Sequence, residues 1–144
     1  MFHMTLKAAT LLLLISLPAA VSAESWELVG RTYNSAGFID RSRIVSTNGA
    51  KLLSLVRISA QPVEDGWKEV RQQLAINCAT TLIEDRGSTV YDVDGRGEHY
   101  PGAFRSKASA TTALYRSLFE AVCKDRKGLT VTNPQAWVRS HMHR

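Results

Sequence analysis

The chain has 144 residues, of which 44% are hydrophobic and 22% are charged, and its formal net charge is +5. This length allows one domain with a buried core, and no repeat or low-complexity run interrupts it. Acidic and basic residues are interspersed rather than gathered into a basic stripe, so the composition argues against a nucleic-acid-binding protein.

Residues 1–23 have the order of features found in a cleavable signal peptide. Lys7 precedes an apolar run over residues 8–15, and small residues end the segment at Ala23. This run is shorter than the roughly 20 apolar residues of a membrane-spanning helix. We therefore expect cleavage between Ala23 and Glu24, export to the periplasm or the medium, and no integral membrane anchor.

Short extended segments separated by turn residues open the mature chain. Trp26–Arg31 predicts a first strand, residues 33–37 have turn composition, and residues 38–40 predict a short extended piece. Asn48-Gly49 is the strongest hairpin dipeptide of the chain, and it leads into a strand over Lys51–Ser59.

The clearest alternation of apolar and polar residues comes next. Apolar residues from Val70 to Cys78 share one parity, broken only at Gln72, which is typical of a strand with one buried face. Two β-rich runs follow over residues 80–85 and 88–93, and Arg86-Gly87 predicts a tight turn between them. The turn spacing favours an antiparallel meander of about six strands.

One amphipathic helix follows the predicted strands. Ser109 is its expected cap, and apolar residues recur at three- and four-residue spacing from Leu114 to Cys123. Such a helix covers one face of a sheet, so we expect an α+β fold. The sequence predicts a domain over residues 24–126 and a C-terminal tail over residues 127–144.

Both cysteines fall on predicted apolar surfaces, Cys78 on the strand and Cys123 on the helix. They face the same core if the helix packs on the sheet. An even number of cysteines in an exported chain favours a disulfide between them. The alternative is two free buried thiols that pack as small hydrophobes.

No pattern predicts a metal or another cofactor. Residues 92–97 begin like a calcium loop, but Arg96 and Ala103 occupy the fifth and twelfth positions, where oxygen ligands are required. His141 and His143 are too few for a structural metal site. The sequence also lacks phosphate-loop and dinucleotide-binding motifs.

No catalytic motif is present either, because His99 lies in none of the known arrangements of nucleophile and base. Arginine and aromatic residues surround it in a stretch rich in glycine and proline. Such residues on a loop are typical of protein-binding sites. The candidate partner-binding residues are Arg96, His99, Tyr100 and Phe104. Alternatively, they only hold the connection between strand and helix against the domain.

Several short motifs, in one order, resemble the surface-adhesin E-like domain of Gram-negative bacteria. They are Trp26–Gly30, Gly37–Asp40, a Leu- and Val-rich third strand, Ile76–Cys78 and a helix that ends in Ala121–Cys123. The resemblance covers about residues 24–123. It implies an antiparallel sheet of about six strands, a helix packed on the sheet, and a bridge between Cys78 and Cys123.

The name-giving member of that family is an outer-membrane lipoprotein adhesin that binds host matrix and plasma proteins. This chain departs from it, because Glu24 rather than a cysteine follows the expected cleavage site. The resemblance implies an exported, non-enzymatic module whose partner is a host or envelope protein. Two alternatives stay open: a periplasmic small-ligand-binding or inhibitor protein that uses the concave sheet surface, and an enzyme. A sizeable pocket with a few converging polar groups would favour the first of these.

Overall fold

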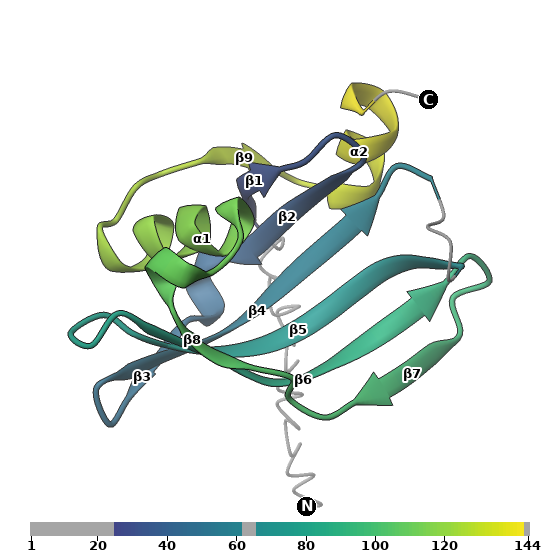
Figure 1. The fold of residues 1–144 in the computed structure, drawn as a ribbon. Helices are drawn as coiled ribbons and strands as arrows, with labels where there is room; N and C mark the ends of the chain where they lie inside the picture. Colours follow the sequence, from purple (N-terminus) through teal and green to yellow (C-terminus); the bar gives the residue numbers. More distant parts are fainter. Residues whose placement is uncertain (1–24, 62–65, 143–144) are drawn as a thin grey trace, which may run out of the picture.

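A computed structural model describes residues 25–61 and 66–142, and the predicted signal peptide with its Ala23–Glu24 cleavage site lies outside them. The described residues form one sheet of nine strands with two α-helices (Figure 1). All the strand pairs are antiparallel, as predicted, but the expected counts of about six strands and one helix are wrong.

Six of the strands form a meander in chain order, and the last strand of the chain lies beside the first. Across the sheet the order is β7-β6-β5-β4-β2-β1-β9, while β3 pairs with β4 and β8 pairs with β6. The strands are β1 (Trp26–Arg31), β2 (Ser35–Asp40), β3 (Val45–Thr47), β4 (Ala50–Ser59), β5 (Trp67–Asn77), β6 (Leu82–Asp92), β7 (Gly97–Tyr100), β8 (Arg105–Lys107) and β9 (Leu129–Val131). The α-helices are α1 (Ala113–Cys123) and α2 (Pro134–His141), with short 3-10 turns at Arg41–Arg43 and Ala108–Ala110.

The predicted hairpin at Asn48-Gly49 is confirmed. It joins β3 to β4. Thr47 pairs with Ala50, so Asn48 and Gly49 form the whole connection between the two strands. Their φ angles are 47° and 77°. Positive φ at both central positions is the geometry that favours Asn-Gly in two-residue hairpins.

The predicted turn at Arg86-Gly87 is wrong, because this dipeptide lies inside one continuous strand, β6. Gln73 of β5 pairs with Gly87 and the next residue pairs with Asp85, so Arg86 is the extra residue of a β-bulge. Gly87 has a φ of 128°, which a residue with a side chain rarely adopts. The buried Asp85 carboxylate accepts hydrogen bonds from the backbone N–H of Gly87 at 3.0 Å and of Ala103 at 2.9 Å.

Two of the additional strands lie in the stretch predicted as a loop. β7 pairs with residues 88–91 of β6 and β8 pairs with residues 82–84, so both use the same neighbour. All but one of their residues are exposed, and they carry no apolar alternation. β2 likewise begins inside the predicted turn over residues 33–37.

The main core lies between the sheet and α1. Helix α1 begins after Thr112 rather than at the expected cap Ser109, which lies in the preceding 3-10 turn. Its buried residues Leu118 and Val122 pack on the apolar side chains of Ile39, Leu53, Leu55, Leu74, Ile76 and Ile83. The predicted disulfide is confirmed: Cys78 and Cys123 are bonded, with their Cα atoms 5.5 Å apart.

A second core lies on the opposite face of the sheet and includes the segment expected to be a tail. β9 pairs with β1, with Trp26 opposite Val131. Helix α2 buries Val138 against Phe38 and places Trp137 edge-to-face on the Phe38 ring, with centroids 5.8 Å apart. The helix starts at a proline, and the Asn133 side chain caps it by accepting a hydrogen bond from Ala136 N at 2.9 Å.

Candidate functional site

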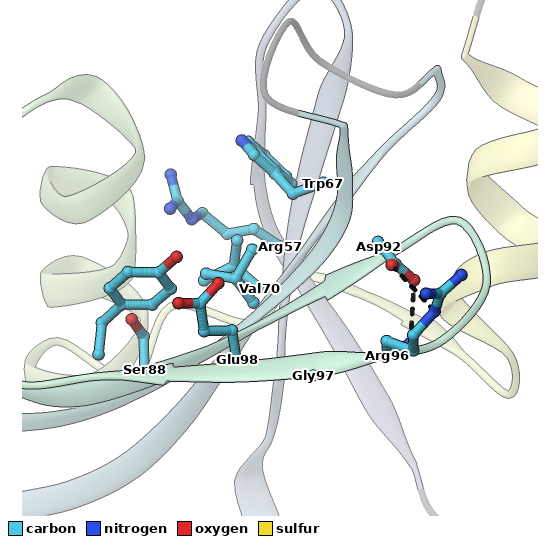
Figure 2. Close-up of a pocket in the computed structure, with 10 residues that line it drawn as sticks. Arg57, Trp67, Val70, Ser88, Asp92, Arg96, Gly97 and Glu98 are labelled. Atoms are coloured by element: carbon cyan, nitrogen blue, oxygen red, sulfur yellow. Dashed lines mark hydrogen bonds and ion pairs between the residues drawn. The ribbon is translucent and has the colours of Figure 1, made fainter.

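Helix α1 covers only part of its face of the sheet. Leu114 sits directly over Gly37 of β2, where an added Cβ would lie 2.8 Å from the leucine Cδ1. Beyond α1, the same face of β4 to β7 is open and hollowed, with a volume of about 780 Å³. We call this region the hollow (Figure 2). It is lined by Arg57, Trp67, Val70, Ser88, Val90, Asp92, Arg96, Gly97, Glu98 and Tyr100.

The strand register places four lining residues in one row across the sheet. Arg57 pairs with Val70, Val70 pairs with Val90, and Val90 pairs with Glu98. Directly paired residues of neighbouring strands point to the same face. Figure 2 shows the side chains of Arg57, Val70 and Glu98 on this face. The floor of the hollow is therefore two valines, with a cation at the end near α1 and a carboxylate at the sheet edge.

A second row joins the hollow to α1. Gln72 of β5 pairs with Ser88 of β6, and Ser88 pairs with Tyr100 of β7. The buried Gln72 side chain accepts a hydrogen bond from the hydroxyl of Tyr115 on α1 at 2.7 Å. This bond explains the polar residue that interrupts the apolar parity of β5. Tyr115 and Gln72 fix the boundary between the covered sheet and the hollow.

One nitrogen of the Arg57 side chain is buried without a hydrogen-bond acceptor in the described part of the chain. Its guanidinium carbon lies 5.8 Å from the centre of the Trp67 ring, within cation–π range. Its Nε is the one buried side-chain nitrogen or oxygen without a hydrogen-bond partner among residues 25–61 and 66–142. Leaving such a donor unpaired costs about 1–3 kcal/mol. Buried polar atoms are paired in most proteins, so Arg57 is the group of the hollow that most needs a local explanation.

Of the other charged groups of the hollow, Arg96 and Asp92 have partners within the described residues and Glu98 does not. Arg96 binds Asp94 at 2.7 Å and lies 3.6 Å from Asp92, and Asp92 accepts two backbone hydrogen bonds within the same turn. This self-contained turn is the stretch that begins like a calcium loop. Glu98 is exposed and forms no side-chain hydrogen bond or ion pair within the described part of the chain. Arg57 and Glu98 are thus the charged groups of the hollow that have no ion-pair partner among the described residues and can bind a ligand.

The four candidate partner-binding residues do not form one cluster. Arg96 and Tyr100 line the hollow. His99 pairs with Thr89 and faces the opposite side of the sheet, where its ring would contact a Cβ added at Gly87. Phe104 packs on the main core, edge-to-face with Tyr115 at 5.1 Å between centroids. The sequence-based prediction missed Arg57 and Trp67, although Arg57 shares its parity with Leu53 and Leu55 of β4.

One of the buried carboxylates, Glu27, has a full set of partners. Arg41 donates two hydrogen bonds to its carboxylate, both at 2.7 Å, and Gly128 N donates a third at 2.7 Å. The Arg41 bonds hold the pKa of Glu27 below its usual 4.5, against the opposing effect of burial. In return, the bond to Glu27 raises the pKa of Arg41. Arg41 also donates to the carbonyl of Ala121 at 3.0 Å, so the pair fastens the end of α1 to the sheet.

Within residues 25–61 and 66–142, no three His, Cys, Asp or Glu side chains gather as a metal site would require. No helix in these ranges is long and apolar enough to cross a membrane.

Comparison with known proteins leaves the resemblance untested. No family model matches the chain, and no curated protein or solved structure is significantly similar to it. The similarity to the surface-adhesin E-like domain therefore stays a prediction.

Proposed function

We propose that this chain is an exported, non-enzymatic binding protein that holds a small ligand in the hollow. The observation that carries the proposal is Arg57, whose buried Nε has no partner and points to a ligand that supplies one. The volume of about 780 Å³ lies in the range of small-molecule sites. The floor is apolar, while half of the ten lining residues are polar or charged, which suits a ligand with polar groups.

Two further features support this proposal. The strands that carry the hollow continue into the packed core under α1, so a ligand would bind a surface that the fold already holds in place. The Cys78–Cys123 disulfide is compatible with an oxidising compartment, as expected for a periplasmic or secreted protein.

A titration followed by two-dimensional ¹H–¹⁵N NMR tests the proposal. The chain has three tryptophans, and Trp26 and Trp137 pack on the second core, away from the hollow. Small carboxylates with an apolar tail, such as hexanoate and phenylacetate, should shift the indole N–H signal of Trp67 and leave the other two in place. The R57M variant should lose the response, and the R86M variant, altered at an exposed arginine outside the hollow, should keep it.

Binding of a protein partner is a second candidate function, and the free edge of the sheet favours it. All four residues of β7 are exposed, and in the described part of the chain β7 pairs only with β6. Such an edge can accept an added strand from another protein. Purified protein should then be retained by immobilised matrix, plasma or envelope proteins. Equal retention of wild type and the Y100P variant, which disrupts the edge strand, would contradict this function.

A further inference from the structure

We infer that the ligand of the hollow is a zwitterion of α-amino-acid chemistry, an amino acid or a short peptide, with its carboxylate at Arg57 and its ammonium group at Glu98. This inference rests on the proposed function and names the class of ligand. It depends on the two available charges, their positions in one row of the sheet, and the apolar surface between them.

The charges in the hollow favour a ligand that carries both signs over a ligand that carries one. Arg96 is paired with Asp94 and Asp92 within its own turn, which leaves Arg57 and Glu98 as the lining charges without an ion-pair partner among the described residues. A simple anion such as hexanoate is attracted by Arg57 but repelled by Glu98, so it should bind more weakly than a zwitterion, and a simple cation meets the reverse arrangement. A ligand that carries both charges, each next to its opposite, satisfies both groups at once.

The spacing of the row favours a ligand whose two charges are separated along its length, as in a short peptide. Arg57 and Glu98 stand on strands three positions apart, which places their backbones about 14 Å from each other. No ion pair joins them across the floor of the hollow. The ligand therefore lies along the row, with its carboxylate towards α1 and its ammonium group towards the sheet edge.

Apolar surface is available between the charges for the side chain of such a ligand. Val70 and Val90 form the floor, and the rings of Trp67 and Tyr100 belong to the same lining. Arg57 presents several N–H donors, which suit the two oxygens of a carboxylate. The Ser88 hydroxyl lies on the floor beside the row, as Figure 2 shows, where it can bond a peptide group.

Four probes test the assignment: the dipeptide leucyl-phenylalanine, its N-acetyl derivative, its C-terminal amide, and free leucine. Affinities are measured by calorimetry, and the Trp67 indole signal reports the place of binding. We expect the dipeptide to bind about tenfold or more tightly than either blocked derivative, because each has lost one charged partner. Comparison of the dipeptide with free leucine then shows whether the natural source is a peptide or an amino acid.

Two variants separate the roles of the charges. In R57M the dipeptide and its amide should bind equally, and in E98Q the dipeptide and its N-acetyl form should bind equally. The R86M control should behave as wild type. Equal binding of all three dipeptide forms to wild type would overturn the zwitterion but leave the hollow as a binding site. If no probe of any charge shifts the Trp67 indole signal, the proposed function fails together with the inference.

Discussion

The α1 face of the sheet has two parts, which differ in whether their charged side chains have partners. Under the end of α1, Arg41 and Glu27 are joined by two short hydrogen bonds, and each has further backbone partners. In the hollow, Arg57 has a buried nitrogen without a partner, and Glu98 is exposed without one. An ion pair whose groups all have hydrogen-bond partners stabilises a fold. Charged groups without partners cost stability, and they remain able to bind a ligand. Matched substitutions should therefore change stability by unequal amounts in the two parts.

The largest effect is expected where covalent bonding holds the covered part together. Replacing Cys78 by serine should lower the free energy of unfolding by about 2–4 kcal/mol, because the bridge no longer restricts the unfolded chain. Urea denaturation measures this change. Thiol labelling of denatured, unreduced wild type should find no free cysteine, and two labelled thiols would contradict the bridge.

The next largest effect is expected at Glu27. E27Q should lower the free energy of unfolding by about 2 kcal/mol, because it weakens three hydrogen bonds to a buried carboxylate. The matched variant E98Q should change it by less than about 0.5 kcal/mol, since Glu98 is exposed. Equal losses in the two variants, measured by urea denaturation, would remove the distinction between the two parts.

The pH dependence of stability should show the same pair. Because the pKa of Glu27 is lowered in the folded protein, the unfolded chain binds the proton more readily. The stabilisation is fully present above the usual pKa of 4.5 and is lost as the pH falls through the lowered folded value. The stability gap between wild type and E27Q should therefore narrow between pH 6 and pH 3. A gap that stays constant over this range would show that the charge of Glu27 is not responsible.

The smallest effect on stability is expected at Arg57. R57M keeps the apolar stem but removes the unpaired Nε, which offsets the loss of its contact with Trp67. We expect a change within about 0.5 kcal/mol, or a slight gain. The same substitution at Arg41 should cost about 2 kcal/mol, because it leaves the Glu27 carboxylate buried without its main partner. A comparable loss in R57M would assign Arg57 to the structure rather than to binding.

Apolar patterning made much of the fold predictable from the sequence. The alternation in β5 and the stripe of α1 place Cys78 and Cys123 on facing apolar surfaces, and the bridge follows. The strands that escaped prediction are short or exposed, as β7 and β8 are, and they gain their order from the neighbour β6. Local pattern carries little information about such pairing. The bulge at Arg86 has the same cause, since glycine in a strand and glycine in a turn look alike in sequence.

The candidate site was less predictable than the fold. Its lining combines β4, β5, β6 and β7, and only the strand register puts Arg57 and Glu98 in one row. His99 and Phe104 were predicted as part of the site because they are close to Arg96 and Tyr100 in the sequence. In the structure His99 points to the opposite face of the sheet, and Phe104 packs on the main core. The sequence feature that could have identified the site is Arg57, which lies among apolar residues on the face of β4 that packs under α1. A charge at a core position needs a local explanation, whether a partner in the fold or a ligand.

The pairing of β1 with β9 bears on the order in which the protein folds. Trp26 and Val131 meet although almost the whole described chain separates them, and contacts between such distant residues form slowly. Strands β2 to β7 and helix α1 can assemble, and the Cys78–Cys123 bridge can form, before β9 is in place. Until then β1 is an uncovered edge, and Phe38 lacks its cover from α2. For as long as β9 has not paired with β1, the first strand of the chain is therefore open to association with other chains.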